Sequence, residues 1–264
     1  MCNIKMKNIM NIFLNIYRKV SILLPVDYEM YSIHKFMESS SEKIKNGSLV
    51  LDAAAGTQPY KKYFTHCKYQ STDYIDMTDI GIKHDFICNV NNIPQKNKVY
   101  DAIINTQTLE HVKDPQKVVN EFYRILKPRG KLFLTAPGCW GVHYAPNNFF
   151  TFTNYGLELI FKNAGFKVVS IKPRGGFFIY LGRMMLELPF NIYGQYLFKN
   201  GMKSMEHSKP GKINYKNPLV YLLAIPFILS LPICIILSPL IGLILDPLDK
   251  EKNFTLGYSC YCEK

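Results

Sequence analysis

Small residues and a carboxylate follow an apolar stretch in LVLDAAAGTQPY, residues 49–60. Gly56 lies shortly after Asp52, and a residue without a Cβ lets the backbone approach a ligand closely. A diphosphate would require a tighter glycine-rich turn that leads directly into a helix, but Pro59 follows Gly56 within three residues. The segment therefore favours a cofactor without phosphate groups over a dinucleotide.

A second carboxylate, Asp73, lies at the end of KYQSTDY, residues 68–74. A carboxylate can accept hydrogen bonds from both hydroxyl groups of a ribose. Asp73 therefore indicates a nucleoside-type ligand.

The elements that must position these residues alternate between short apolar runs and helix-like stretches from residue 48 to residue 176. This alternation is typical of an α/β fold in which mostly parallel strands are joined by helices. Strands are expected at residues 48–53, 68–74, 84–90, 100–107, 131–137 and 166–174. Ligands of such open sheets bind beyond the carboxyl ends of the strands, so the loops after the first four strands are the expected site.

Two helices are expected between these strands. Residues 114–130 begin with Asp114 as a possible N-cap and Pro115 in the first turn, and Pro128 and Gly130 are expected to end the helix. Its apolar face is formed by Val118, Val119, Phe122, Ile125 and Leu126. Residues 153–165 predict the second helix, capped by Thr153 or Asn154.

Five segments, taken in order, resemble class I S-adenosylmethionine-dependent methyltransferases of the subgroup related to quinone and surface-polysaccharide biosynthesis. They are VLDAAAGTQPY, STDY, CNVNNIP, YDAIINTQTLEHVKDPQKVVNEFYRILKPRGKLFLTAP and WGVHYAPNNFFTFTNYGLELIFKNAGF. The resemblance covers residues 48–176 and implies a Rossmann-like seven-stranded sheet with helices on both faces. It also implies S-adenosylmethionine as the cofactor.

By this resemblance, the cofactor site would follow the carboxyl ends of four strands. Asp52, Ala54 and Gly56 would border the methionine moiety, and Asp73, with Tyr74 beside it, would hold the ribose. The remaining residues would be Asn89 and Val90, which flank the adenine, and Asn105 and Thr106, which close the site.

Three positions depart from the family pattern. Family members usually have Gly where this chain has Ala54 and often where it has Gln58, and they usually have Asp at the position of Asn89. A methyl group at residue 54 is unfavourable if the backbone there has a positive φ, whereas Asn89 keeps an amide oxygen for the adenine amino group. Weakened cofactor binding is therefore expected rather than its loss.

His143, in CWGVHYAPNN after the fifth strand, is the candidate catalytic base. Methyl transfer proceeds by in-line attack on the sulfonium, so a base is needed only for a weak nucleophile such as a hydroxyl group. Imidazole titrates in a useful range, but His143 could equally fix its loop by hydrogen bonding. His111, in LEHV, is expected to have a structural role at the start of the following helix.

The composition narrows the function classes. The formal net charge of +12 favours an anionic partner, but the charge coincides with apolar segments rather than a separate basic domain, which disfavours nucleic acid. The seven cysteines are scattered and indicate a reducing compartment, not a disulfide framework or a zinc site. No metal site is expected from the sequence, and Cys260 and Cys262 are interpreted as buried thiols.

Two segments indicate a membrane. Residues 1–25 predict a basic amphipathic helix, which either packs on the domain or lies on a membrane surface. Residues 217–245 contain no charged side chain but four prolines. Because residues 254–264 resemble the last, antiparallel strand of the methyltransferase sheet, the apolar segment is expected to enter and return as a hairpin bent near Pro232. Residues 177–216 would form interfacial helices between these segments.

Other interpretations of the apolar segment remain open. It could be a buried core or dimer insertion, or it could cross the membrane and leave the tail outside. The expected domains are a helical region at 1–47, the cofactor-binding core at 48–176, a hydrophobic helical insertion at 177–253 and the final core strand at 254–264.

The sequence therefore predicts a membrane-associated S-adenosylmethionine-dependent methyltransferase on the cytoplasmic face of a bacterial-type membrane. Its acceptor would be a small molecule or, more specifically, a lipid-linked or surface-polysaccharide precursor. A prenyl-quinone methyltransferase is the alternative enzyme. A degenerate methyltransferase fold that serves as a membrane scaffold is the alternative from a different class.

Overall fold

The computed structural model describes residues 27–197 and 219–264, and these residues divide into two compact units. The sheet unit comprises Ser32–Arg174 and Phe254–Lys264. The helical unit comprises Gly175–Asn253 and the described residues before Ser32. The predicted helix at 1–25 lies outside the described residues.

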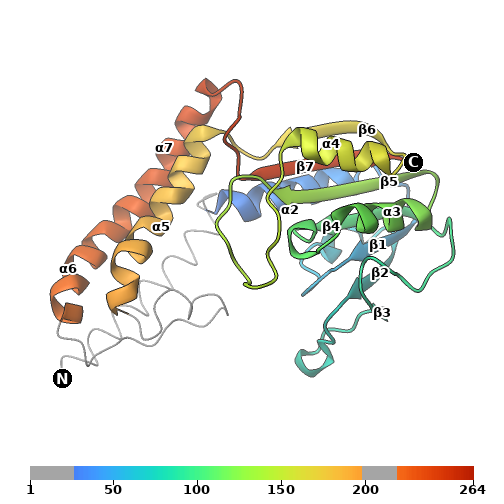
Figure 1. Cartoon of the computed structure of the whole chain (residues 1–264), viewed down its shortest axis with the longest axis horizontal. Coiled ribbons are helices and arrows are strands. Elements are labelled where there is room, and N and C mark those ends of the chain that lie inside the picture. The colour runs from blue at the N-terminus through green and yellow to red at the C-terminus, as the bar shows by residue number, and fades with distance from the viewer. Residues whose placement is uncertain (1–26, 198–218) are drawn as a thin grey trace. The chain divides into compact units, whose positions relative to one another are not determined.

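A seven-stranded sheet forms the centre of the sheet unit, in the order β3-β2-β1-β4-β5-β7-β6 (Figure 1). The strands are β1 (Leu49–Ala53), β2 (Lys68–Asp73), β3 (Phe86–Ile87), β4 (Tyr100–Thr106), β5 (Leu126–Pro137), β6 (Lys167–Pro173) and β7 (Gly257–Glu263). β7 is antiparallel to both β5 and β6, and the other pairs are parallel. The predicted α/β fold and the antiparallel final strand are confirmed.

Helices cover both faces of this sheet, as alternate strand residues show. Leu51 and Ile103 pack in one buried cluster with residues of α3 (Pro115–Ile125) and α4 (Asn154–Asn163). Their neighbours Val50 and Ile104 pack in a second cluster with α2 (Tyr28–Ser41). Successive strand side chains point to opposite faces, so runs that are apolar at every position require cover on both sides.

The predicted start of α3 is confirmed, but its end is not. Asp114 accepts a hydrogen bond from the Lys117 N–H at 3.0 Å, and Pro115 lies in the first turn. The helix ends at Ile125 rather than at Pro128, because Leu126 has an extended backbone and pairs with Tyr100 at the start of β5. Strand pairing with β4 thus outweighs the helical pattern at residue 126. Thr153 caps α4 by accepting from the Gly156 N–H at 3.0 Å.

The helical unit places α5 (Phe177–Leu197) alongside a second helical run (Figure 1). That run consists of α6 (Leu219–Pro232), the π-helix η5 (Ile233–Leu237), α7 (Ser238–Leu245) and the 3₁₀ turn η6 (Asp246–Leu248). A Cβ on Gly242 would lie 2.8 Å from the Phe178 carbonyl oxygen, so the helices require glycine at this close approach. Asp246 accepts from the Gly176 N–H at 2.7 Å and thereby caps the start of α5.

The predicted hairpin bend near Pro232 is wrong. Pro232 has helical φ and ψ of −60° and −39°, and the chain continues through η5 into α7. Proline removes one backbone hydrogen bond but has a φ that suits a helix, and the wider π turns after Pro232 accommodate the altered hydrogen-bond register. Among the helices of residues 27–197 and 219–264, none combines the length and apolar character needed to span a membrane.

Candidate functional site

The loop after β1 is held against the end of β2 by two hydrogen bonds. The Ala55 N–H donates to the Thr72 carbonyl at 2.9 Å, and the Gly56 N–H donates to Asp73 Oδ2 at 2.8 Å. The other Asp73 oxygen accepts from the Ile75 N–H at 3.1 Å. Asp73 therefore fixes the loop that contains Gly56. Its carboxylate is half-buried, and each oxygen keeps a lone pair for a further hydrogen bond.

Both departures from the family glycines lie at left-handed backbone positions. Ala54 has φ +57° and Gln58 has φ +55°, on either side of Gly56 at φ +51°. This conformation costs a residue with a Cβ about 1–2 kcal/mol. Gln58 offsets part of this cost through its amide, which donates to Ser71 Oγ at 3.1 Å and to the Lys83 carbonyl at 2.9 Å. Ala54 has no side-chain polar group with which to do the same.

Asp52 is buried beneath this loop. Its Oδ2 accepts from the Tyr69 hydroxyl at 2.5 Å, and its Oδ1 has no hydrogen-bond partner among the described residues. Burial raises the pKa of Asp52 to about 7, although the Tyr69 hydrogen bond lowers it, and the nearby Asp73 carboxylate raises it further. Asp52 thus titrates near neutral pH at the edge of the predicted cofactor site.

The other predicted cofactor residues lie at the ends of β3 and β4. Asn105 pairs with Ala53 across β1 and β4 and donates to its carbonyl at 2.7 Å, while Asn105 Oδ1 is buried without a partner among the described residues. Thr106 follows, half-buried. Asn89 is exposed, and its Oδ1 accepts from the Asn91 N–H at 3.1 Å.

Two further residues of the predicted set differ in exposure. Val90 is buried in the core, whereas the Tyr74 side chain is 75% exposed and extends from the end of β2. The Cys88 N–H donates to the Asp73 carbonyl at 2.9 Å, which brings the Asn89–Val90 segment to the same edge as Asp73. The predicted residues therefore gather at the carboxyl ends of β1, β2, β3 and β4.

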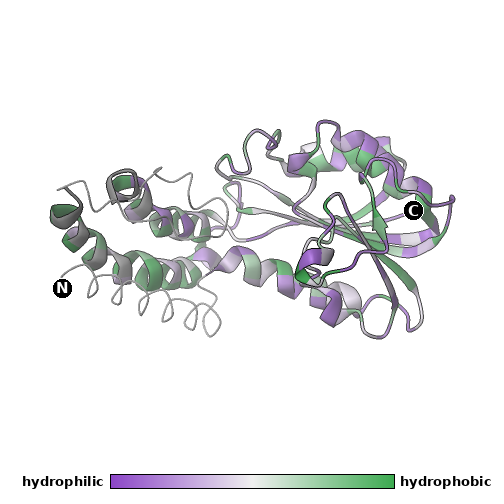
Figure 2. Cartoon of the chain, turned by 90° about the horizontal axis from the view of Figure 1, so that it is seen from below, coloured by the Kyte–Doolittle hydropathy of each residue, from purple (hydrophilic) through white to green (hydrophobic). Residues whose placement is uncertain are grey.

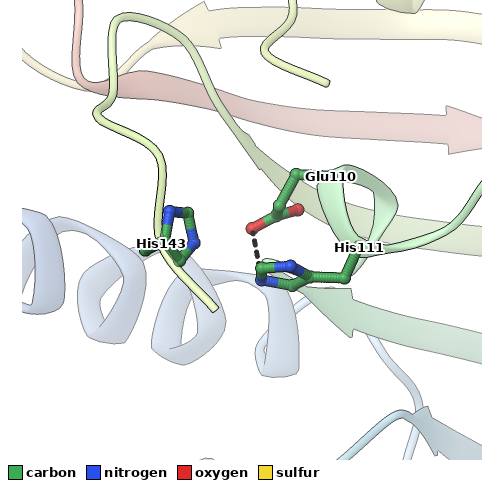
Figure 3. A group of neighbouring side chains, drawn as sticks. All are labelled: Glu110, His111 and His143. Atoms are coloured by element: carbon green, nitrogen blue, oxygen red, sulfur yellow. Dashed lines mark ion pairs between the residues drawn. The ribbon is translucent and has the colours of Figure 1, made fainter. Parts of the chain in front are cut away.

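His143 lies on the loop after β5, where it meets the loop after β4. Its ring and that of His111 are 4.9 Å apart and nearly perpendicular (Figure 3). His111 Nδ1 lies 2.7 Å from the Asn147 carbonyl oxygen, and His143 Nδ1 lies 3.0 Å from the Gly141 carbonyl oxygen. The loop-fixing role considered for His143 is thus present as a hydrogen bond, and His111 joins the two loops.

A cavity of about 200 Å³ lies at the amino ends of the strands, opposite the predicted cofactor site. It is lined by residues at the amino ends of β1, β4 and β5, including Lys43, Asp101, Lys127, Arg129 and Lys131. Lys127 is paired with Asp101 at 2.8 Å. Because open α/β sheets bind ligands at the carboxyl ends of their strands, this cavity is not the cofactor site.

A family model described as a methyltransferase domain matches residues 27–171, which is more than half of the chain. The chain belongs to this methyltransferase family. An uncharacterized methyltransferase of Schizosaccharomyces pombe is 25% identical over 138 residues, which are 45% of this chain and 46% of that protein. The match thus spans less than half the length of this relative.

Solved structures share the methyltransferase fold. The [4+2]-cyclase SpnF has a TM-score of 0.52 at 13% identity, over 88% of this chain and 80% of its own. The Burkholderia thailandensis 1,6-didemethyltoxoflavin-N1-methyltransferase, solved with S-adenosylhomocysteine, has a TM-score of 0.45 at 15% identity, over 62% and 83% of the two chains. A protein named as a cyclase shares this fold, so the fold alone does not determine the reaction.

S-adenosylmethionine is the cofactor of the methyltransferase domain, and the geometry at the carboxyl ends of β1, β2, β3 and β4 fits it. A Cβ built on Gly56 meets no atom within 4 Å, so the space over this glycine is open. Asp73 offers a carboxylate of the kind that recognises a ribose. Asp52 Oδ1 and Asn105 Oδ1 are buried polar atoms that a ligand's donor groups would satisfy.

Ala54→Gly is expected to stabilise the protein by about 1 kcal/mol, because glycine adopts the left-handed backbone without a steric penalty. For a chain of this size this corresponds to a rise in Tm of about 2–4 °C, which thermal unfolding would measure. Ala55→Gly is the matched control. Ala55 is buried and is not among the residues with positive φ, so its substitution should lower the Tm. An unchanged or lower Tm for Ala54→Gly would contradict the strain at this position.

Two members of the site were missed by sequence reasoning. The Tyr69 hydroxyl donates a hydrogen bond to Asp52 from the neighbouring strand β2. The two residues meet because β1 and β2 pair with Asp52 opposite Ser71, and this register arises only when the sheet forms. Glu110 lies beside His111 and is 1% exposed. A buried acid next to a histidine within LEHV was the available signal, but its relation to His143 depends on how two loops meet.

Proposed function

We propose that this protein is a membrane-associated S-adenosylmethionine-dependent methyltransferase that acts on a lipid-linked or surface-polysaccharide precursor at the cytoplasmic face of a membrane. Family membership and the geometry at the carboxyl ends of β1, β2, β3 and β4 support methyl transfer. The observation that supports the membrane is an exposed apolar stripe on the helical unit.

This stripe follows α6, η5, α7 and η6 at intervals of three or four residues, which is the spacing of one helical face. Its members are between 45% and 74% exposed: Leu222, Ile225, Leu229, Ile233, Leu237, Ile241, Ile244 and Leu248. Figure 2 shows the hydrophobic colouring of these helices. Residues 217–245 carry no charged side chain. Full burial of one such side chain contributes about 1.5–3 kcal/mol, so a lipid interface would gain substantially from this surface.

The loop after β5 supports an apolar acceptor. Four large apolar side chains of this loop are 39–80% exposed: Val142, Tyr144, Phe149 and Phe150. They follow the strand whose carboxyl end lies at the cofactor edge of the sheet. An apolar rim at this place would contact the lipid or prenyl part of an acceptor while its polar group reaches the site.

The chain's own residues would position the reactants. Bound S-adenosylmethionine supplies a methyl group activated by its sulfonium charge. Asp73 and the Gly56 loop would hold the cofactor, and Asn105 would line the site from β4. His143 remains the predicted base for a hydroxyl acceptor, and it lies on the same loop as the exposed apolar side chains that we infer contact the acceptor.

Membrane association is tested by flotation of the full chain with phosphatidylcholine vesicles, with and without phosphatidylglycerol. The wild type is expected to float with the vesicles, and Leu229→Glu combined with Ile244→Glu should lower the bound fraction at least about 10-fold, since two charges would enter an apolar interface. Leu159→Glu is the matched control, because Leu159 is equally exposed on the sheet unit at 61%. If the wild type stays in solution as a dimer that the double variant dissociates, the stripe is a subunit interface instead.

The acceptor class is tested with methyl-labelled cofactor and candidate acceptors in mixed micelles. Methylation of a lipid-linked glycan is the expected result. Methylation of a prenyl quinone alone would establish the alternative enzyme. The left-handed Ala54 favours the non-catalytic scaffold as a second candidate, and absence of binding at millimolar cofactor would support it.

A further inference from the structure

Glu110, His111 and His143 converge where the loops after β4 and β5 meet (Figure 3). One potential ligand atom from each residue lies within 4.8 Å of the other two. Glu110 Oε1 and His111 Nε2 are 3.7 Å apart. Two nitrogen or oxygen ligands of a tetrahedral ion with bonds of about 2.0–2.2 Å are separated by roughly 3.4 Å. The Glu110–His111 pair is close to this separation, and the pairs with His143 would have to close by at most about 1.4 Å.

Hydrogen bonds give both histidines the form that binds metals. The backbone carbonyls of Asn147 and Gly141 are acceptors, so each histidine must donate its Nδ1 proton to form the bond of 2.7 Å or 3.0 Å. The neutral ring then carries its lone pair on Nε2. A carbonyl bonded to one ring nitrogen is the usual partner that orients a metal-binding histidine.

The third side chain is a carboxyl group in a buried position. Glu110 is 1% exposed. Its backbone carbonyl accepts from the Phe149 N–H at 2.7 Å, which fixes the two loops against each other. Glu110 and the two histidines therefore meet at a place where backbone hydrogen bonding holds the two loops together.

We propose that Glu110, His111 and His143 bind one divalent transition-metal ion, such as Zn²⁺. Two imidazoles and one carboxylate suit such ions, and three protein ligands leave one position of a tetrahedral ion open. An oxygen atom of an acceptor could occupy this position, so the ion would orient the acceptor. Because metal binding uses the Nε2 lone pair of His143, a metal-bound His143 would not act as the base, and the ion would take its place. Metal binding itself does not depend on the proposed acceptor.

Metal binding is tested on the untagged full chain in detergent, after chelator treatment, by calorimetric titration with Zn²⁺ and by absorption spectroscopy with Co²⁺. One ion per chain is expected. His143→Ala and His111→Ala should each weaken Zn²⁺ binding about 100-fold, since each removes one of three ligands, and should alter the Co²⁺ spectrum.

His66→Asn is the matched control, because His66 is a half-buried histidine that bonds the Ile44 carbonyl far from the cluster in sequence. It should bind Zn²⁺ as the wild type does. Glu110→Gln keeps the shape of the buried side chain and should also weaken binding. S-adenosylmethionine titration of each variant reports whether the fold and the cofactor site remain intact.

Absence of Zn²⁺ and Co²⁺ binding by a wild type that still binds S-adenosylmethionine would overturn the metal site and leave the proposed function standing. Equal Zn²⁺ affinity in the wild type and in His143→Ala would overturn it as well. A wild type that binds metal but no cofactor would retain the metal site and contradict methyl transfer.

Discussion

Asp73→Ala is expected to weaken S-adenosylmethionine binding by about 100-fold in calorimetric titration of the full chain. The substitution removes a carboxylate that would accept two hydrogen bonds from the ribose, and each such bond to a charged group contributes about 1.5–3 kcal/mol. It also releases the Gly56 N–H, which Asp73 Oδ2 holds at 2.8 Å. The cofactor would then have to order the loop as it binds.

Two further variants separate these causes. Asp73→Asn keeps an oxygen for Gly56 but loses the charge, so we expect an intermediate loss of about 10-fold. Asp79→Ala removes an exposed acid of the neighbouring 3₁₀ turn, Thr78–Ile80, and should leave the affinity unchanged. Tight binding by Asp73→Ala would show that the cofactor does not use the end of β2.

The second large effect concerns the pH dependence of stability. Burial raises the folded-state pKa of Asp52 to about 7 from its ordinary value of 3.8. The folded state therefore holds a proton that the unfolded state releases between these values, and the free energy of unfolding falls as pH rises through this interval. The contribution of protonated Asp52 to the free energy of unfolding is complete below about pH 4 and lost above about pH 7. Its upper limit is about 4 kcal/mol.

Denaturant unfolding of Asp52→Asn at several pH values tests this assignment. The variant should lack the decline in stability between pH 4 and pH 7 that Asp52 causes, while its amide oxygen can still accept from Tyr69. Asp101→Asn is the control. Although burial opposes it, hydrogen bonds from Lys127 and Leu49 lower the pKa of Asp101, so this variant should keep the decline above pH 4. An unchanged decline in Asp52→Asn would assign it to another group.

The positions of the strands along the chain and the placement of Asp73 at the end of β2 were predictable because they depend on local patterns. An apolar run that ends in a carboxylate or a glycine turn indicates both a strand and the end of that strand at which a ligand binds. The contact between Asp73 and Gly56 follows because β1 and β2 are adjacent and parallel. The caps of α3 and α4 were predictable for the same reason.

Features that depend on tertiary contacts were not predictable in this way. The end of α3 at Ile125 depends on pairing between Leu126 and Tyr100, and the path through Pro232 depends on a π-helix that no sequence pattern indicated. The convergence of His111 and His143 requires two loops to meet. His111 and its carbonyl partner Asn147 are 36 positions apart, and no periodic pattern between them indicates that contact.

The position of β7 bears on how the protein is made. β7 lies between β5 and β6, and its Gly257–Glu263 backbone pairs with both. The ribosome must therefore translate residues 175–253 before the sheet can close, which takes about 4–16 s at 5–20 residues per second. During this interval β5 and β6 lack their shared neighbour and expose strand edges. Unpaired strand edges can pair with other chains, so the nascent chain is most prone to aggregation until residue 263 has emerged.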